Sequence, residues 1–309
     1  MRGLRLRKGA PAHACRGPLL GLVSLGLASC SGGVLDPLGP VGAGDATILI
    51  DATVIMLAIV VPTILLAFWV AWRYRASNPR AEYLPYWSYS GRIEAVVWSI
   101  PTLTIMFLGG LIWIGSTRLD PFRPLPSETP PLEVQVVALD WKWLFIYPQQ
   151  GIATVNQLVV PAGTPVHFSI TSASVFNVFF VPRLGSMIYA MPGMISQLHL
   201  QADRPEQTWG LSAHFSGDGF SDMQFAVKSV PAADFQAWAA GARGAGPTLD
   251  QAAYAGLTQQ TQRVQPATYG AIDPRLFDAV ANQTLPPGPG PQPESPEHTG
   301  REISSGGKD

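Results

Sequence analysis

The sequence has little charge and almost no cysteine. Charged residues make up 13% of the 309 residues, the formal net charge is −1, and the two cysteines are Cys15 and Cys30. Without a basic excess, the chain lacks the electrostatic signature of a nucleic-acid-binding protein. Without cysteine after Cys30, the rest of the chain can form no disulfide and offers no thiolate to a metal. Hydrophobic residues reach 47%, which with so little charge indicates a protein partly embedded in lipid.

The first 29 residues have the composition of a bacterial export signal. Basic residues precede an apolar run from Pro18 to Ala28, which is the order found in secretory signal peptides. The run ends in Leu27-Ala28-Ser29-Cys30, which resembles the lipobox of bacterial lipoproteins, where the chain is cut before the cysteine and that cysteine is acylated. We therefore expect a lipoprotein signal peptide over 1–29 and lipidation of Cys30. An uncleaved anchor with an incidental cysteine is the alternative.

Two long runs without charge follow, over 52–72 and 95–117. Each is long enough for an α-helix to cross a hydrocarbon core of ~30 Å. The segment between them is rich in arginine, which places it in the cytoplasm by the positive-inside rule. We expect a periplasmic linker over 30–46, transmembrane helices over 47–72 and 95–117, and a cytoplasmic loop over 73–94.

Glu94 is the ionisable residue at the start of the second helix. A carboxylate in the first turn is usually a solvated residue that interacts favourably with the helix dipole. The functional alternative is the entrance of a proton path against a partner subunit, because ionisable groups at membrane depth are often functional. The residues alone favour the dipole interpretation.

From Arg118 onward the sequence changes to short β-rich runs broken by proline and glycine. Val166, Phe168 and Ile170 alternate with polar residues, as in a strand with one buried face. The spacing of such runs predicts a β-sandwich over 118–230. The expected strands span 132–139, 141–147, 156–160, 165–171, 175–181, 197–201, 208–212 and 223–230.

An aromatic-rich extension over 231–282 is expected to contain short helices at 234–240 and 249–257. After Leu285 the chain is dominated by proline, glycine, serine and glutamate. Such composition cannot bury enough apolar surface to offset the entropy of ordering, so we expect a disordered tail over 283–309.

Three segments of the exported part carry a family resemblance. They are Asp140-Trp141-Lys142-Trp143-Leu144-Phe145-Ile146-Tyr147-Pro148, Phe179 to Ser186, and Ile188 to Met194. Together and in this order they resemble subunit II of the haem-copper respiratory oxidases, and the likeness covers nearly the whole chain. It implies a membrane α-helical hairpin, an all-β cupredoxin-like sandwich and a short helical C-terminal extension.

Members of that family that oxidise cytochrome c hold a binuclear copper centre through two His, two Cys, a Met and a Glu carbonyl. In this sequence Asn177 and Phe220 stand at the two His positions, and Ser212 and Ser216 stand at the two Cys positions. His214 stands at the Glu position. Only Met223 keeps its type. Because a neutral hydroxyl is a poor ligand and a phenyl ring is none, the resemblance implies that no metal is bound here.

The loop Ser216-Gly217-Asp218-Gly219-Phe220-Ser221-Asp222-Met223 looks like the quinol oxidase branch of the family, specifically the bo-type ubiquinol oxidases. The resemblance implies a non-catalytic subunit of an inner-membrane complex that oxidises ubiquinol, reduces dioxygen to water and pumps protons. The haems and copper are expected in subunit I, and the partners are subunit I, further subunits and membrane lipid.

Two more positions match the family. Trp141 matches the aromatic residue through which the cytochrome c branch accepts electrons; here packing or a vestigial role is the expectation. Glu94 matches the carboxylate at the entrance of a proton channel into subunit I. This match favours the proton-path interpretation of Glu94 over the helix-dipole interpretation.

Other candidate sites are weak. His167 and His199 alternate within strands, where a hydrogen-bonded histidine is the ordinary case. A surface site of His214 with Asp218, Asp222 and Met223, and copper binding by Met187, Met191 and Met194, are disfavoured against packing. Two other functions remain: a free-standing membrane lipoprotein with a cupredoxin-like binding domain, and a cytochrome c oxidase subunit II that binds copper.

Overall fold

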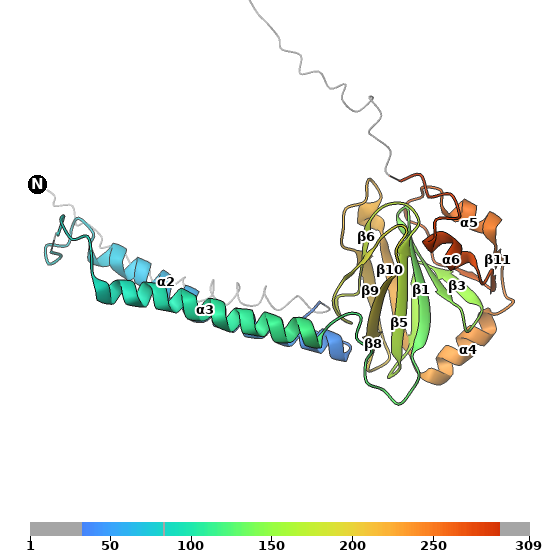
Figure 1. Ribbon diagram of the computed structural model, residues 1–309, viewed down its shortest axis with the longest axis horizontal. Coiled ribbons are helices and arrows are strands. Elements are labelled where there is room, and N and C mark those ends of the chain that lie inside the picture. The colour runs from blue at the N-terminus through green and yellow to red at the C-terminus, as the bar shows by residue number, and fades with distance from the viewer. Residues whose placement is uncertain (1–32, 83, 291–309) are drawn as a thin grey trace, which may run out of the picture.

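Figure 1 shows the protein, as a computed structural model, with two long helices that run side by side away from a β-sandwich. The structure describes residues 33–82 and 84–290. The expected signal peptide and the expected lipidation site at Cys30 lie outside these residues, as do residues 291–309.

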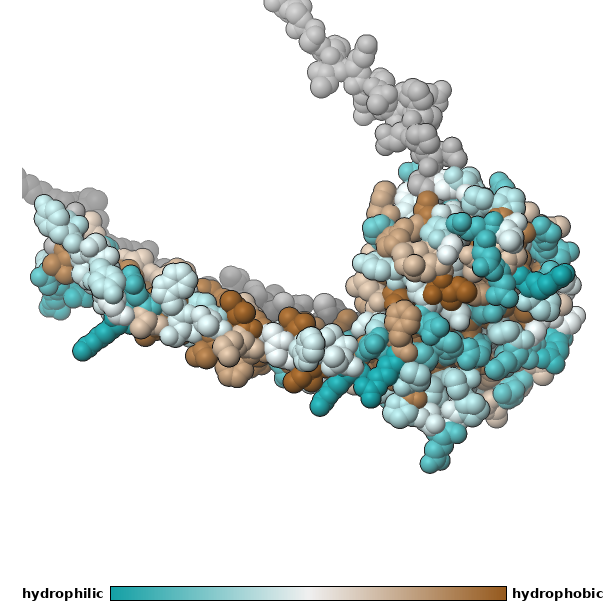
Figure 2. Space-filling view, viewed as in Figure 1, coloured by the Kyte–Doolittle hydropathy of each residue, from teal (hydrophilic) through white to brown (hydrophobic). Residues whose placement is uncertain are grey.

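The two long helices are α2 (Pro40–Arg73) and α3 (Gly91–Arg118). In the most apolar 18-residue window of each helix no residue is buried, so both are candidate membrane spans by length and composition. Figure 2 shows the apolar side chains on the outside of the hairpin. Such a surface is stable in lipid, whereas in water it would drive association.

Helix α2 begins earlier than the apolar run, because Pro40 is well suited to the first helical turn. With 34 residues it is about 51 Å long, which exceeds the hydrocarbon core. The excess lies at its N-terminal end, where Val41, Gly42 and Ala46 are buried. The helix therefore continues beyond the candidate membrane span and packs against the sandwich.

Two sheets form the sandwich, as the alternation predicted. The six-stranded sheet has the order β12-β3-β2-β1-β5-β8, with β12 (Ala267–Tyr269), β3 (Ile152–Val155), β2 (Lys142–Tyr147), β1 (Leu132–Leu139), β5 (Pro165–Ser172) and β8 (Ser196–Gln201). The five-stranded sheet has the order β4-β10-β9-β6-β7, with β4 (Gln157–Pro161), β10 (Gln224–Val230), β9 (Glu206–Ser212), β6 (Asn177–Phe180) and β7 (Ile188–Ala190). The predicted class, a helical hairpin followed by an all-β sandwich and a helical extension, is confirmed.

Aromatic side chains fill the space between the sheets. Trp143 and Phe145 are two residues apart on β2, so both point to the same face. The ring of Trp143 lies 5.5 Å from that of Phe179 and 5.7 Å from that of Phe225, and Phe145 lies 5.0 Å from Phe225. This cluster fixes β6 and β10 against the six-stranded sheet. Asn177 is the first residue of β6, and Met223 immediately precedes β10.

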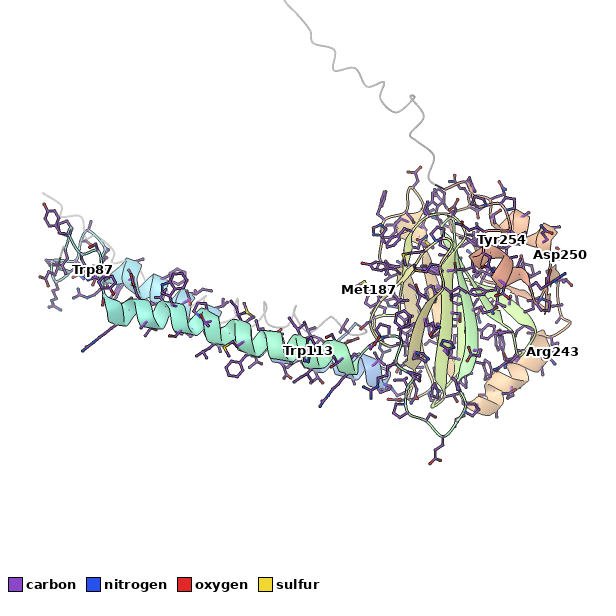
Figure 3. The ribbon with its side chains drawn as sticks, in the orientation of Figure 1. Trp87, Trp113, Met187, Arg243, Asp250 and Tyr254 are labelled. Atoms are coloured by element: carbon purple, nitrogen blue, oxygen red, sulfur yellow. The ribbon has the colours of Figure 1, made fainter. Side chains whose placement is uncertain are left out.

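The expected strands are found within two residues of their predicted bounds. The sandwich strands β3, β7 and β12 were not predicted, because four, three and three residues are too few to show an alternation. The C-terminal extension contains α4 (Ala232–Ala242), α5 (Gln251–Leu257) and α6 (Leu276–Ala281), and β11 (Thr248–Leu249) pairs with β13 (Ala271–Ile272). Figure 3 labels Asp250, which caps α5 through a hydrogen bond from the Ala253 N–H at 2.9 Å.

Residues 283–290, which we call the C-terminal strap, differ from the predicted disordered tail. The Gly288 N–H donates to the Ala173 carbonyl at 2.9 Å, and the Gly290 N–H donates to the Asp140 carboxylate at 2.9 Å. Gln260 donates to the Gly290 carbonyl. These bonds are made with distant residues, and composition carries no signal for them.

Arg183 joins the chain before α2 to the sandwich. Its side chain is 6% exposed, and its guanidinium donates to the Asp36 carbonyl at 2.8 Å, the Asp36 carboxylate at 2.8 Å and the Glu206 carboxylate at 2.5 Å. The Leu38 N–H donates to the Arg183 carbonyl at 2.7 Å. The hydrogen bond from Arg183 lowers the pKa of the Glu206 carboxyl below its ordinary value. We call this group the Arg183 joint.

Candidate functional site

The positions that correspond to the family's copper ligands meet at one end of the five-stranded sheet. Asn177 begins β6, Ser212 ends β9, and Met223 immediately precedes β10. Strands β6 and β9 are antiparallel neighbours, with Phe179 opposite Ser212. The loop from residue 213 to residue 222 therefore folds back over the start of β6.

Buried polar atoms in this group bond to one another. The Ser212 hydroxyl donates to the Asn177 side-chain oxygen at 3.1 Å and to the His214 carbonyl at 3.3 Å. The Ser216 hydroxyl lies 3.9 Å from the Met223 sulfur. The Ser212 N–H donates to the Met223 carbonyl at 3.1 Å. Sequence reasoning grouped these residues only through the family resemblance, whereas the structure places their polar atoms in contact.

Two of the corresponding side chains lie at the rim of the group. The His214 ring is exposed and packs edge-on against Phe176, with ring centres 4.9 Å apart. Phe220 is in the short 3₁₀ helix η2 (Phe220–Asp222) and packs against Phe215 at 5.7 Å. Both rings thus contribute to an aromatic rim and not to the polar centre.

Trp141 covers the loop from the side of the six-stranded sheet. It is 7% exposed and has a positive φ of 62°. Its indole N–H donates to the Ser216 carbonyl at 3.0 Å. A Cβ at Gly219 would lie 2.3 Å from the indole ring, so the loop reaches this position only with glycine. Trp141 is therefore a packing partner of the loop in this structure.

The neighbouring Asp140 and Lys142 were not identified as site residues. The Asp140 carboxylate accepts hydrogen bonds from the Gly290 N–H and the Ser174 hydroxyl. The Lys142 ammonium donates to the Gln259 carbonyl at 2.7 Å, and burial lowers its pKa to about 8. The sequence does contain a signal for these two residues, because they alternate with tryptophans. A charged side chain that is buried beside tryptophans needs polar partners. The extension thus holds the Asp140–Lys142 turn from outside.

The chemistry of the converging donors is limited. They are two hydroxyls, an amide and a thioether. Soft copper centres require thiolate and imidazole donors together with thioether, and only Met223 belongs to that class. Over residues 33–82 and 84–290, no three His, Cys, Asp or Glu side chains are grouped so that they could hold a metal ion.

Glu94 lies far from this group, in the first turn of α3. Figure 3 shows Trp87, in the loop just before α3, at the end of the hairpin opposite the sandwich. The Glu94 N–H donates to the Ser90 carbonyl at 3.0 Å, and its side chain is exposed. The structure therefore places Glu94 and the sandwich at opposite ends of the two candidate membrane spans.

Known protein families match both the sandwich and the C-terminal extension. Residues 134–230 match the family model described as cytochrome c oxidase subunit II, periplasmic domain, and residues 243–288 match the aromatic-rich motif of these oxidases. The chain is 50% identical to a ubiquinol oxidase subunit 2 from Acetobacter aceti, over 82% of this chain and 83% of the relative. It is 44% identical to a cytochrome bo(3) ubiquinol oxidase subunit 2 from Pseudomonas aeruginosa, over 89% and 83%.

Among solved structures, the periplasmic domain of subunit II of a cytochrome oxidase from Bradyrhizobium japonicum is 22% identical. The match covers 37% of this chain and 94% of that chain, with a TM-score of 0.35.

Proposed function

The chain belongs to the family of subunit II of the haem-copper quinol oxidases, and on that premise we propose that it is the copper-free, non-catalytic subunit of a proton-pumping ubiquinol oxidase. In this proposal the complex oxidises ubiquinol and reduces dioxygen to water. The haems and the copper are held by subunit I, and ubiquinol delivers its electrons within the membrane. No redox step is assigned to this chain.

The donor chemistry around Ser212 carries the proposal. The Ser212 hydroxyl donates to the Asn177 amide oxygen, and the Ser216 hydroxyl lies beside the Met223 sulfur; neutral oxygens of this kind do not compete for a soft metal. A subunit without a copper relay cannot pass electrons inward from a soluble donor. A quinol, which reaches the complex through the lipid, needs no such relay.

The exposed apolar surface supports assembly with a partner membrane subunit. Both helices present apolar side chains along their length. On the sandwich, four apolar side chains are more than half exposed, namely Met187, Tyr189, Met194 and Phe215. Figure 3 shows Met187 on the side of the sandwich that faces the hairpin. A membrane subunit beside the hairpin would cover this surface, and exposed apolar patches commonly mark such contacts.

The described residues near the N-terminus support anchoring at the outer face. Asp36 and Leu38 are bonded to Arg183 of the sandwich, so the chain that follows Cys30 is held at the outer end of the hairpin. We propose that Cys30 carries acyl chains in the outer leaflet of the bacterial inner membrane. The acyl chains and the two helices would then hold the sandwich at the periplasmic surface.

We propose Glu94 as the entrance of a proton path into subunit I. Its position at the end opposite the sandwich, in the turn that follows the arginine-rich loop, supports access from the cytoplasm. A carboxylate can accept a proton there and release it to a neighbouring group. Glu94→Gln is expected to lower proton uptake and quinol oxidase turnover about 100-fold or more, the lower end of the range for loss of a proton-transfer group. Glu82→Gln, in the same loop, is the control, and equal turnover in the two variants would remove Glu94 from the path.

Purification tests the assignment as a whole. A tagged full chain, extracted gently from its native membrane, is expected to co-purify with a haem-bearing subunit and with quinol oxidase activity. A protein that is stable alone and never carries haem would instead be a free-standing lipoprotein, and the proposal would fail.

A further inference from the structure

His167 and His199 form a pair on the six-stranded sheet. They lie directly opposite each other on β5 and β8. Their rings are stacked, with centres 4.6 Å apart and planes 15° from parallel. Each residue alone looks like an ordinary strand histidine. The pairing brings two imidazoles together on a different sheet from Asn177 and Ser212.

One nitrogen of each ring is already engaged. His167 Nδ1 lies 2.6 Å from a Glu133 carboxylate oxygen, and His199 Nδ1 lies 3.1 Å from the Pro121 carbonyl. A carboxylate and a carbonyl can only accept, so in each neutral ring Nδ1 carries the proton. The lone pair is thereby left on Nε2 in both rings.

The Nε2 atom of His167 has no hydrogen-bonding partner among the described residues. The atom is also buried. Both rings line a cavity of about 360 Å³ under the loop that leads from α3 to β1. A buried polar atom without a partner costs free energy, so this nitrogen calls for a ligand that accepts its lone pair.

We propose that His167 and His199 bind a divalent transition-metal cation of the zinc type through their Nε2 atoms. Metal-binding histidines characteristically donate the other N–H to a carboxylate or a backbone carbonyl, as both do here. Imidazole is a preferred donor for zinc, copper and nickel. Because the rings are nearly parallel, one must rotate slightly for the lone pairs to converge, and the adjoining cavity gives it room.

Carboxylates lie on the side of the pair where the cation is proposed. Glu133 contacts His167, and Glu128 lines the same cavity. A neighbouring cavity, which His199 also lines, contains Asp120 together with Arg118 and Arg123. The described residues provide two imidazoles, so water would complete the coordination and exchange would be easy. The bound cation would also brace the loop after α3, since His199 holds Pro121. This site is independent of the proposed oxidase function.

Titration of the full chain with Zn²⁺ tests the site. The chain is purified in detergent, stripped with a chelator and titrated by calorimetry. We expect one Zn²⁺ ion per chain. Each of His167→Gln and His199→Gln is expected to weaken binding at least about tenfold, and Glu133→Gln about 10- to 100-fold, which is the usual effect of removing a ligand's hydrogen-bond partner. His214→Gln, which removes a lone exposed imidazole, should leave the affinity unchanged.

A measurement on the unaltered chain avoids any dependence on variant folding. With one equivalent of Cu²⁺, electron paramagnetic resonance is expected to show coupling to two equivalent imidazole nitrogens. A spectrum with one coupled nitrogen, or Zn²⁺ binding that is equal in the unaltered chain and in the double variant His167→Gln/His199→Gln, would overturn the proposal.

Discussion

Ser212 and Ser216 differ from cysteine by one atom each, and at the scale of single residues that atom decides the chemistry. A thiolate donates to soft metals, whereas a hydroxyl stays protonated and forms hydrogen bonds. Ser212 does so with Asn177 and with the His214 carbonyl. The loop is thus held by hydrogen bonds to Asn177 on β6 and from the Trp141 indole as well as by its own backbone.

Gly219 tests the role of Trp141 in shaping the loop. Gly219→Ala places a methyl group where a Cβ would lie 2.3 Å from the indole. We expect a loss of unfolding free energy of about 1–3 kcal/mol, as for other overpacked positions, measured by urea denaturation of the full chain in detergent.

Gly241→Ala is the matched control for this change. Gly241 lies in helix α4, and a Cβ there would meet no atom within 4 Å. Because alanine is the better helix former by about 1 kcal/mol, this variant is expected to be slightly more stable. If the two variants had equal stability, the indole would not constrain the loop.

At the scale of elements, helices and strands with long periodic patterns were predictable from the sequence. Strand β1 has the predicted bounds, and α2 and α3 contain the predicted apolar runs. What the sequence could not predict is which distant segments meet. Asp140 and Gly290 are 150 residues apart, and Asp36 and Arg183 are 147 residues apart. Such contacts depend on the complete fold and leave no local pattern.

The C-terminal strap is expected to contribute to stability, although its composition is that of a disordered segment. A chain that ends at residue 282 loses the hydrogen bonds of Gly288 and Gly290 and leaves Asp140 buried without one donor. We expect it to be less stable by about 2–4 kcal/mol, the sum of an unsatisfied buried group and a lost hydrogen bond. A chain that ends at residue 290 keeps both bonds and should match the full chain in thermal unfolding. Equal stability of the two truncated chains would refute a structural role for the strap.

The Arg183 joint is expected to stabilise the contact between the chain before α2 and the sandwich. Arg183→Met removes the hydrogen bonds that a buried guanidinium donates to Asp36 and Glu206, which is expected to cost about 1–3 kcal/mol in unfolding free energy, as for hydrogen bonds of charged groups. Arg183 lowers the pKa of Glu206, so the ionised Glu206 stabilises the folded state. This stabilisation is fully present above the ordinary glutamate pKa and is lost as pH falls through the lowered pKa. The difference between the parent and variant should therefore shrink in acid.

Arg204→Met is the control for the joint, because Arg204 contacts the same carboxylates with a side chain that is 54% exposed. Exposed ion pairs contribute about 0–1 kcal/mol, so thermal unfolding should change little. A larger loss for Arg204→Met than for Arg183→Met would show that the joint depends on surface charge and not on the buried guanidinium.

At the scale of the whole molecule, the protein combines a hairpin of two candidate membrane spans with a sandwich fixed to one end of it. The Arg183 joint and the buried first turns of α2 connect the two parts. Hydrophobic run length and β alternation were sufficient to predict both parts, and the family resemblance supplied the copper-ligand positions. The orientation of the sandwich and the His167–His199 pair followed only from the structure. Together these features support the proposal of a subunit that assembles with a redox partner without carrying electrons itself.

Copper analysis of the full chain tests the central claim most directly. The chain is produced with added copper, purified in detergent and dialysed against a chelator, and its copper content and near-infrared absorption are then measured. The account predicts no chelator-resistant copper and no near-infrared band, because the described loop residues offer a thioether but no thiolate. Two tightly held copper ions per chain, with the absorption of a binuclear centre, would contradict it.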